Sequence, residues 1–188
     1  SSILGLNSRS VLFTANYNNR KYKNIANSKL QTAKILIKNN VSTPNIISKF
    51  KKFQDVENFD WTNLPDKFAI KPSRGLGGDG IIVVKKKLKS GNFLTTSKEV
   101  KTIADFKLHI IDILEGAYSM GSEPDVAFVQ EYVGRHKVFR KLSYRGTPDI
   151  RIIVFNKIPV MAMLRLPTKE SGGRANLHQG ALGLGIDL

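Results

Sequence analysis

The 188-residue sequence contains no cysteine, a single tryptophan and half as many acidic as basic residues. Without cysteine, disulfide bonds, thiolate zinc sites and cysteine nucleophiles are excluded. No apolar run approaches the roughly 18 residues of a membrane span, and no charged and then apolar signal peptide opens the chain. We therefore expect a cytoplasmic protein without a membrane span.

The shortage of acidic residues leaves a formal net charge of +15 and an isoelectric point near 10.1. Such a charge attracts polyanions, among them nucleotides, acidic peptides, nucleic acid and membrane surfaces, although a solvated lysine-rich surface is the simpler interpretation. Hydrophobic residues make up 41% of the chain, which is ordinary for a folded domain. The length suits one domain or two small lobes.

Periodicity predicts an α+β order of elements. Residues 28–40 and 102–116 have the apolar spacing of helices, and Asn27 or Ser28 and Thr102 are their expected N-caps. The positions of the first helix that we expect on one apolar face are Leu30, Ala33 and Ile37. Short strands are expected over residues 68–71, 81–84, 93–96, 126–133, 149–155 and 159–165.

The stretch KPSRGLGGDG at 71–80 is rich in glycine and runs directly into IIVV. Gly75, Gly77 and Gly80 satisfy G-x-G-x-x-G, but a strand follows where a dinucleotide fold needs a helix. A P-loop is excluded too, because isoleucine follows the last glycine. Two interpretations stay open: a plain hairpin with a solvated Lys71, or a flap whose backbone N–H groups cover phosphates beside that lysine.

Five motifs in order extend this pattern over nearly the whole chain, from about Leu4. They are NSKLQTAKILIKNNVSTP, the lysine with its glycine loop, VQEYV, DIRIIVFNKIPVMAMLR and GGRANLHQGA. Together they resemble the ATP-grasp superfamily, in the branch of ribosomal-protein glutamate ligases and α-L-glutamate-ligase-like proteins. The resemblance implies an α+β fold in which two lobes hold ATP between antiparallel sheets. It divides the chain into an N-terminal helical segment (1–50), a small lobe with the flap (51–125) and the start of a larger lobe (126–188).

Family position also assigns roles to individual residues. Those expected to bind the nucleotide are Lys29, Lys71, Gly75, Gly77, Gly78, Gly80, Gln130, Glu131, Tyr132, Val133, Asp149 and Asn176. Those expected to hold anionic intermediates or substrate are Arg151, Arg165 and Arg174. The residues alone leave three alternatives: an exposed helical lysine at 29, strand packing at 131–132 and an exposed hairpin face at 149–151. Serine also stands where the family has aspartate before the first lysine.

The resemblance implies an ATP-dependent carboxylate–amine ligase that works through an acyl phosphate, with magnesium and an acidic amino acid or peptide as substrate. No E-x-N motif follows Asn176, and Asp187 matches an earlier family position. We therefore assign no metal ligand within the chain and expect the ligands beyond residue 188, as in the first two-thirds of a ligase. The alternatives are a nucleotide-binding remnant without catalysis and a basic nucleic-acid-binding domain. The second lacks a recognisable motif, so no specific nucleic acid is expected.

Overall fold

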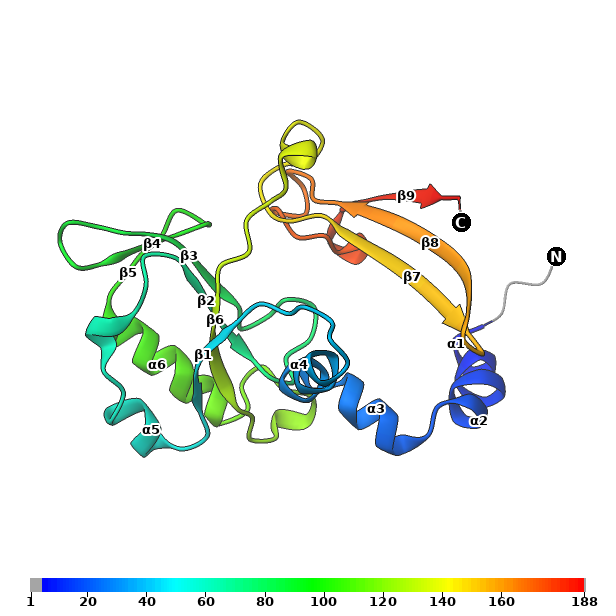
Figure 1. The fold of residues 1–188 in the computed structure, drawn as a ribbon, viewed down its shortest axis with the longest axis horizontal. Coiled ribbons are helices and arrows are strands. Elements are labelled where there is room, and N and C mark those ends of the chain that lie inside the picture. Colours follow the sequence, from blue (N-terminus) through cyan, green and yellow to red (C-terminus); the bar gives the residue numbers. More distant parts are fainter. Residues whose placement is uncertain (1–4, 188) are drawn as a thin grey trace.

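The computed structural model describes residues 5–187 as an α+β fold with two antiparallel sheets (Figure 1), which confirms the predicted fold class. The larger sheet has the strand order β1-β6-β2-β3-β4-β5, and the smaller has the order β7-β8-β9. The strands of the larger sheet are β1 (Ile46–Phe50), β2 (Phe68–Pro72), β3 (Ile82–Lys87), β4 (Phe93–Thr95), β5 (Val100–Lys101) and β6 (Ala127–Glu131). Those of the smaller sheet are β7 (Asp149–Phe155), β8 (Ile158–Leu166) and β9 (Leu182–Ile186).

Helices precede and interrupt the larger sheet. The α-helices are α1 (Leu6–Ser8), α2 (Ala15–Tyr17), α3 (Arg20–Ala26), α4 (Lys29–Lys38), α5 (Phe53–Glu57) and α6 (Ile103–Leu114). A π-helical segment, η1 (Arg9–Thr14), joins α1 to α2, and the 3-10 turns are η2 (Trp61–Asn63), η3 (Met120–Ser122), η4 (Lys137–Arg140) and η5 (Leu177–Gln179). The predicted caps are confirmed, since the Ser28 hydroxyl accepts from Gln31 N–H and Thr102 forms a capping box with Asp105.

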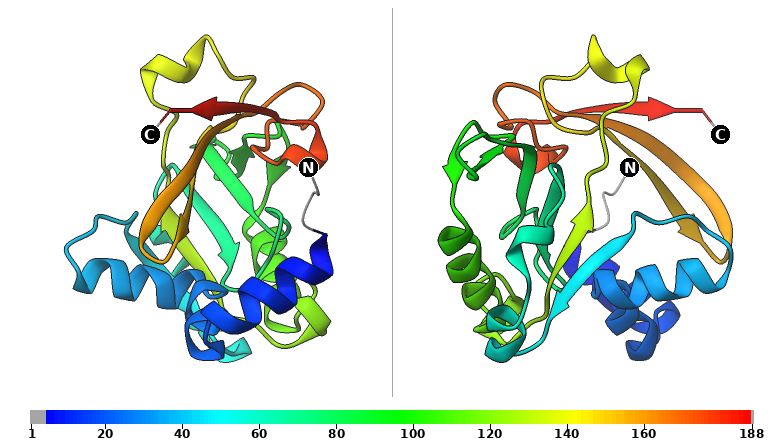
Figure 2. Two further views of the ribbon diagram at one scale, coloured as in Figure 1. Left: turned by 90° about the vertical axis from the view of Figure 1, so that its right-hand side faces the viewer. Right: turned by 60° about the vertical axis from the view of Figure 1, so that its left-hand side comes forward.

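The hydrophobic core lies between the larger sheet and α5 and α6, which cover one of its faces, while α4 lies on the other side of the sheet (Figures 1 and 2). Phe68 of β2 contacts Phe93 and Phe106 with ring centroids 5.6 Å away in both cases, and all three rings are fully buried. Because this face is closed, the opposite face of the sheet is the one that can hold a ligand.

Alternation along the central strands decides which side chains reach that opposite face. Phe68 and Ile70 point into the core, so Lys71, the next residue of β2, points away from it. In β6, the pairing partner of β2, Val129 belongs to the core and Gln130 lies on the Lys71 side. Two polar side chains therefore lie side by side on the face that α5 and α6 leave uncovered.

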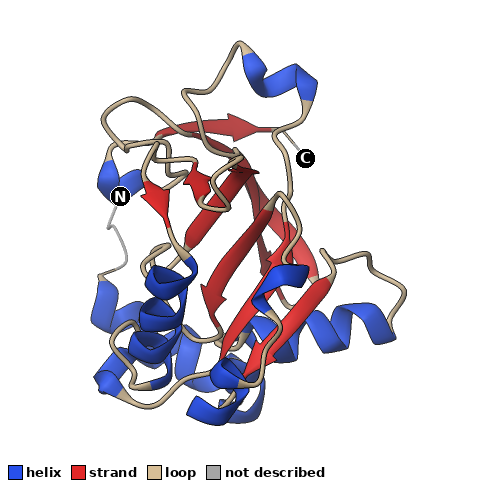
Figure 3. Ribbon diagram, turned by 90° about the vertical axis from the view of Figure 1, so that its left-hand side faces the viewer, coloured by secondary structure: helices blue, strands red, loops and turns tan. Residues whose placement is uncertain are grey.

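The smaller sheet is a long hairpin with one added strand. β7 and β8 turn at Asn156 and Lys157, whose φ angles of 47° and 68° are those of a type I′ turn. The tip of this hairpin packs on the N-terminal helices, where the Phe155 ring lies 5.9 Å from Phe13 and 5.1 Å from Tyr17. The α-helices gather toward one end of the molecule, and the short 3-10 segment η4 lies at the other end (Figure 3).

Two expectations were wrong in detail. Ile37, placed on the apolar face of the first helix, is 59% exposed, while Ala33 on the same helix is buried. The strand expected over 126–133 ends at Glu131, so Tyr132 and Val133 follow it as irregular chain.

Candidate functional site

Lys29 occupies the first position of α4, where the Ser28 cap fixes the direction of the helix. Its backbone N–H donates to Ser73 O at 2.9 Å, and the Ser28 and Ser73 hydroxyls lie 3.0 Å apart. The Lys29 ammonium donates to Pro72 O at 3.1 Å and to Gly75 O at 2.6 Å. The lysine is therefore bound to the start of the glycine loop and is not an exposed helical lysine.

Lys71 is the second cation of the site. Its ammonium donates to Gln130 Oε1 at 2.7 Å, and the amide nitrogen of the buried Gln130 donates to Pro44 O at 3.3 Å. Gln130 thus fixes the lysine side chain through a neutral acceptor. Within the described residues 5–187, neither Lys71 nor Lys29 forms an ion pair.

Both ammonium groups are partly removed from water, and this perturbs them. Burial lowers the pKa of Lys71 below its ordinary value. Burial also lowers the pKa of Lys29, and the charge of Lys71 lowers it further, while the charge of Asp125 opposes the shift. Two cations that repel each other across partly dry surroundings make a site that gains from bound negative charge.

Asp125 was not expected in the site. It is buried beside the start of β6, and its two carboxylate oxygens accept from Arg74 N–H at 2.7 Å and Val126 N–H at 2.8 Å. Since Arg74 directly precedes the glycine loop, Asp125 fixes the backbone at the start of the loop while partly compensating the charge of Lys29. An acidic residue directly before a strand is a common pattern, so the sequence alone did not identify Asp125 as part of the site.

The glycine loop, residues 75–80, lies between the ends of β2 and β3. Gly78 and Gly80 have φ angles of 89° and 71°, which non-glycine residues adopt only with strain. The loop tip carries Asp79, whose carboxylate lies 3.9 Å from the Arg174 guanidinium in the segment between β8 and β9. This long, exposed ion pair connects the loop with the smaller-sheet part of the chain.

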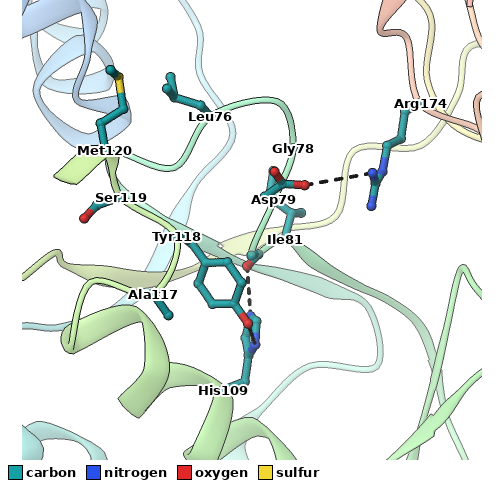
Figure 4. A pocket seen from close by; sticks show the side chains of 11 residues that line it. Leu76, Gly78, Asp79, Ile81, His109, Ala117, Tyr118, Ser119, Met120 and Arg174 are labelled. Atoms are coloured by element: carbon teal, nitrogen blue, oxygen red, sulfur yellow. Dashed lines mark hydrogen bonds and ion pairs between the residues drawn. The ribbon is translucent and has the colours of Figure 1, made fainter. Parts of the chain in front are cut away.

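An open hollow of about 680 Å³ borders the loop and Arg174. His109 of α6 and Tyr118 form its floor, as Figure 4 shows. His109 Nε2 lies 2.8 Å from Gly80 O, and the Tyr118 hydroxyl lies 3.3 Å from His109 Nδ1. Neither Lys29 nor Lys71 lines this hollow, so the cations and the hollow are two separate neighbours of one loop.

Other residues expected at the site lie elsewhere. Asp149 and Arg165 face each other across β7 and β8, where Arg165 Nε donates to Asp149 Oδ1 at 2.6 Å and the terminal Nη2 contacts the second oxygen. Bonding to Asp149 raises the pKa of Arg165 above its usual range. Arg151 is exposed on β7, and Asn176 caps η5 by accepting from His178 N–H at 3.2 Å.

The segment expected beside adenine starts at the end of β6. Glu131 N–H donates to Asn45 O at 2.9 Å, and the Glu131 carboxylate accepts from the Asn45 amide at 2.8 Å. The backbone N–H of Glu131 is therefore engaged. Tyr132 and Val133 lie beyond the strand, outside its pairing with β1 and β2.

A metal site would need several donor side chains that lie close together. Across residues 5–187, no three His, Cys, Asp or Glu side chains gather closely enough to hold an ion. Residues 1–4 and 188 lie outside the described residues.

In the described part of the chain, no helix has both the length and the apolar character of a membrane span.

Comparison with known proteins identifies a family. The family model described as sugar-transfer associated ATP-grasp matches residues 8–188, which is nearly the whole chain. No curated protein matches, and no solved structure does.

Proposed function

The chain belongs to the sugar-transfer associated ATP-grasp family, and from this premise we propose that it binds ATP and joins a carboxylate to an amine. The ATP-grasp part of the prediction is confirmed by the family match. The glutamate-ligase branch is not what the matched family describes. Three further points stay part of the proposal: an acidic amino acid or peptide as substrate, magnesium as the metal, and the cytoplasm as the compartment.

The observation that carries the proposal is the pair of partly buried lysines. Among residues 5–187, Lys29 and Lys71 donate only to neutral oxygens, those of two backbone carbonyls and one amide. Both have a lowered pKa, and the charge of Lys71 adds to the shift at Lys29. A triphosphate supplies the negative charge that this arrangement lacks, and the loop 75–80 supplies backbone N–H groups beside it.

On the base side, we assign the edge contacts to the backbone of Tyr132 and Val133, because Glu131 N–H is engaged by Asn45. The carboxylate of Asp149 is engaged by Arg165, so these two act as a fixed pair at the start of the smaller sheet. Arg151 and Arg174 are the cations that we assign to the anionic substrate, since arginine suits bidentate contact with carboxylate or phosphate.

The proposed chemistry has two steps. A carboxylate oxygen of the substrate attacks the γ-phosphorus of ATP, and the bond to the β–γ bridging oxygen breaks, which releases ADP and leaves an acyl phosphate. The amine then attacks the acyl carbon, phosphate leaves and the amine loses a proton, so an amide is formed. The residues of the chain supply positive charge and orientation in both steps, and no protein nucleophile is needed.

Magnesium would neutralise developing charge between the β and γ phosphates. The acidic side chains within residues 5–187 do not fit this role, because no cluster of donors exists there. No step is therefore assigned to a metal held by these residues. ATP binding and catalysis become separate questions, and nucleotide binding without turnover would favour the non-catalytic alternative.

Nucleotide binding is the first test, by isothermal calorimetry with ATP. Lys71→Ala removes a charged donor, which is worth about 1.5–3 kcal/mol, so binding should weaken at least about tenfold. Lys29→Ala should act in the same direction. The matched controls are Lys67→Ala, an exposed lysine just before β2, and Lys34→Ala, an exposed lysine of α4. Equal affinity of Lys71→Ala and Lys67→Ala would remove Lys71 from the site.

Substrate class is tested by phosphate release with magnesium, ATP and pairs of acids and amines. The panel contains glutamate and acidic peptides, and also sugar acids and amino sugars because of the family description. Activity with the sugar compounds alone would mean that the substrate is a sugar derivative and not a glutamate-type compound. Tight duplex or single-strand binding at physiological salt, without ATP binding, would promote the nucleic-acid alternative.

A further inference from the structure

Both ends of the glycine loop are held through a backbone carbonyl by a side chain from another element. At the first end, Lys29 of α4 donates to Gly75 O at 2.6 Å. At the second end, His109 of α6 lies 2.8 Å from Gly80 O. The two clamps differ in kind, because the first is a cation assigned to phosphate and the second is not.

The contacts of His109 define its protonation. A carbonyl oxygen only accepts, so Nε2 carries the proton that it donates to Gly80 O. In the neutral ring Nδ1 is then the acceptor, and the Tyr118 hydroxyl donates to it at 3.3 Å. Burial lowers the pKa of His109 below its ordinary value and so favours this neutral form, while the hydrogen bond to Gly80 O and the charge of Asp112 oppose the shift and the charge of Lys101 adds to it. The Gly80 carbonyl therefore requires the proton on Nε2, and the Tyr118 hydroxyl is a suitable partner for Nδ1 of that tautomer.

Tyr118 also contacts the loop directly. Gly80 has a φ of 71°, and a Cβ placed on it would lie 2.6 Å from Cγ of the Tyr118 ring. The ring thus packs against the bare backbone at the point where the loop enters β3. Figure 4 shows His109 beside the Tyr118 ring, with Asp79 pointing to the other side toward Arg174.

We propose that His109 and Tyr118 are positioning residues for the flap: they fix its Gly80 end, so that the loop backbone stays in place over a bound triphosphate. The inference deepens the proposed function, on which it rests for the identity of the ligand. It assigns to α6, otherwise a core helix, a second task in the placement of the nucleotide-binding loop.

The test compares three variants with the parent chain in two measurements. Amide hydrogen exchange of residues 76–81 is measured without nucleotide, and ATP affinity is measured by calorimetry. His109→Phe removes the donor, Tyr118→Phe removes only the hydroxyl, and His109→Gln offers an amide N–H to the same carbonyl. The control is His136→Phe at an exposed histidine, and the thermal midpoint and exchange of β6 report on general damage.

We expect His109→Phe to exchange the flap amides several-fold faster and to bind ATP about three- to tenfold more weakly, the range of one hydrogen bond. Tyr118→Phe should show smaller changes of the same sign. His109→Gln should recover most of both losses, and His136→Phe should match the parent. β6 should keep its protection in every variant that folds.

The inference is overturned if Tyr118→Phe and His109→Phe leave flap exchange and ATP affinity unchanged. It is also overturned if His109→Gln falls as far as His109→Phe, because then packing and not the donor matters. If His109→Phe fails to fold, Tyr118→Phe and His109→Gln decide. Should the parent chain bind no ATP while flap exchange still responds as expected, the proposed function fails and the clamp at Gly80 stands.

Discussion

The two sheets of this chain differ in what covers them. The larger sheet closes one face against α5 and α6, and Phe68, Phe93 and Phe106 are fully buried there. In the smaller sheet, β7 is exposed or half-buried at every residue, and every residue of β9 is exposed. In β8, Ala162 and Leu166 are buried. One sheet is therefore a packed scaffold, and the other is held mainly by backbone pairing, by these two side chains and by a few side-chain contacts at its ends.

The distribution of site residues follows this difference. Lys29, Lys71 and Gln130 are anchored by hydrogen bonds on or beside the packed sheet. Arg151 and Arg174 lie on the sparsely covered side, where Arg174 meets only the distant Asp79 carboxylate among described acids. Groups that hold a nucleotide in one geometry need a rigid support, whereas groups that meet a variable substrate need less of one.

The difference in packing between the two sheets is tested most directly by removing one large side chain from each sheet region. Phe106→Ala should lower the free energy of unfolding by about 3–5 kcal/mol, because it opens a cavity among buried rings. Ile152→Ala, at a 52% exposed position of β7, should change it by less than about 0.5 kcal/mol. Urea denaturation followed by circular dichroism measures both, and equal losses would show that the smaller sheet is as tightly packed as the larger.

The charges of Lys29 and Lys71, on the larger-sheet side, can be tested through the pH dependence of stability and of ATP affinity. Because burial lowers the pKa of Lys29 and Lys71, the unfolded chain binds more protons than the folded chain between the lowered values and 10.5. Without ATP, these lysines therefore add stability as the pH rises through that window. ATP favours the charged ammonium, so its affinity should fall as the pH rises through the lowered pKa values of the two lysines.

Calorimetry at four pH values measures this dependence. A double variant with Lys29→Met and Lys71→Met should bind ATP weakly and with a flatter pH profile. A parent profile that is flat over the same range would mean that neither lysine titrates against bound phosphate.

The smallest effect is expected at the Asp149–Arg165 pair of the smaller sheet. Asp149 is 40% exposed at its side chain, so Asp149→Asn should cost about 0.5–1 kcal/mol. We expect two- to fivefold faster amide exchange in β7 and β8, with β2 and β6 unchanged. Glu99→Gln, at an exposed ion pair beside the larger sheet, is the control. Faster exchange throughout the chain would show that the two sheets unfold together.

The sequence was informative where a local period repeats. Helix α6 was predicted with its cap, because Phe106, Ile110 and Ile113 recur at helical spacing, and all three are buried. Ile37 was misplaced because the period identifies a face of α4 and not whether another element covers it. The strand–glycine loop–strand pattern at 68–87 was predicted for a comparable reason, since turn residues separate two apolar runs.

Family position alone led to Lys29, Lys71, the loop and Gln130. The structure shows Lys29 bonded to the loop and Lys71 bonded to Gln130, and their roles toward ATP stay predictions. His109 was missed. A signal for it existed, because His109 lies between Phe106 and Ile110 on the buried side of α6. The sequence could not show which group meets it there, since Gly80 is 29 residues away and is brought close only by the sheet. Asp125 carried no signal beyond its place before a strand.

The Lys29 ammonium has one further property that follows from elementary geometry. Its three N–H bonds are arranged tetrahedrally, and Pro72 O and Gly75 O take two of them. The direction of the third is thereby fixed relative to β2 and the loop. An approaching anion must arrive along that line to be bound fully, so this nitrogen distinguishes anions by the angle of their approach as well as by their charge.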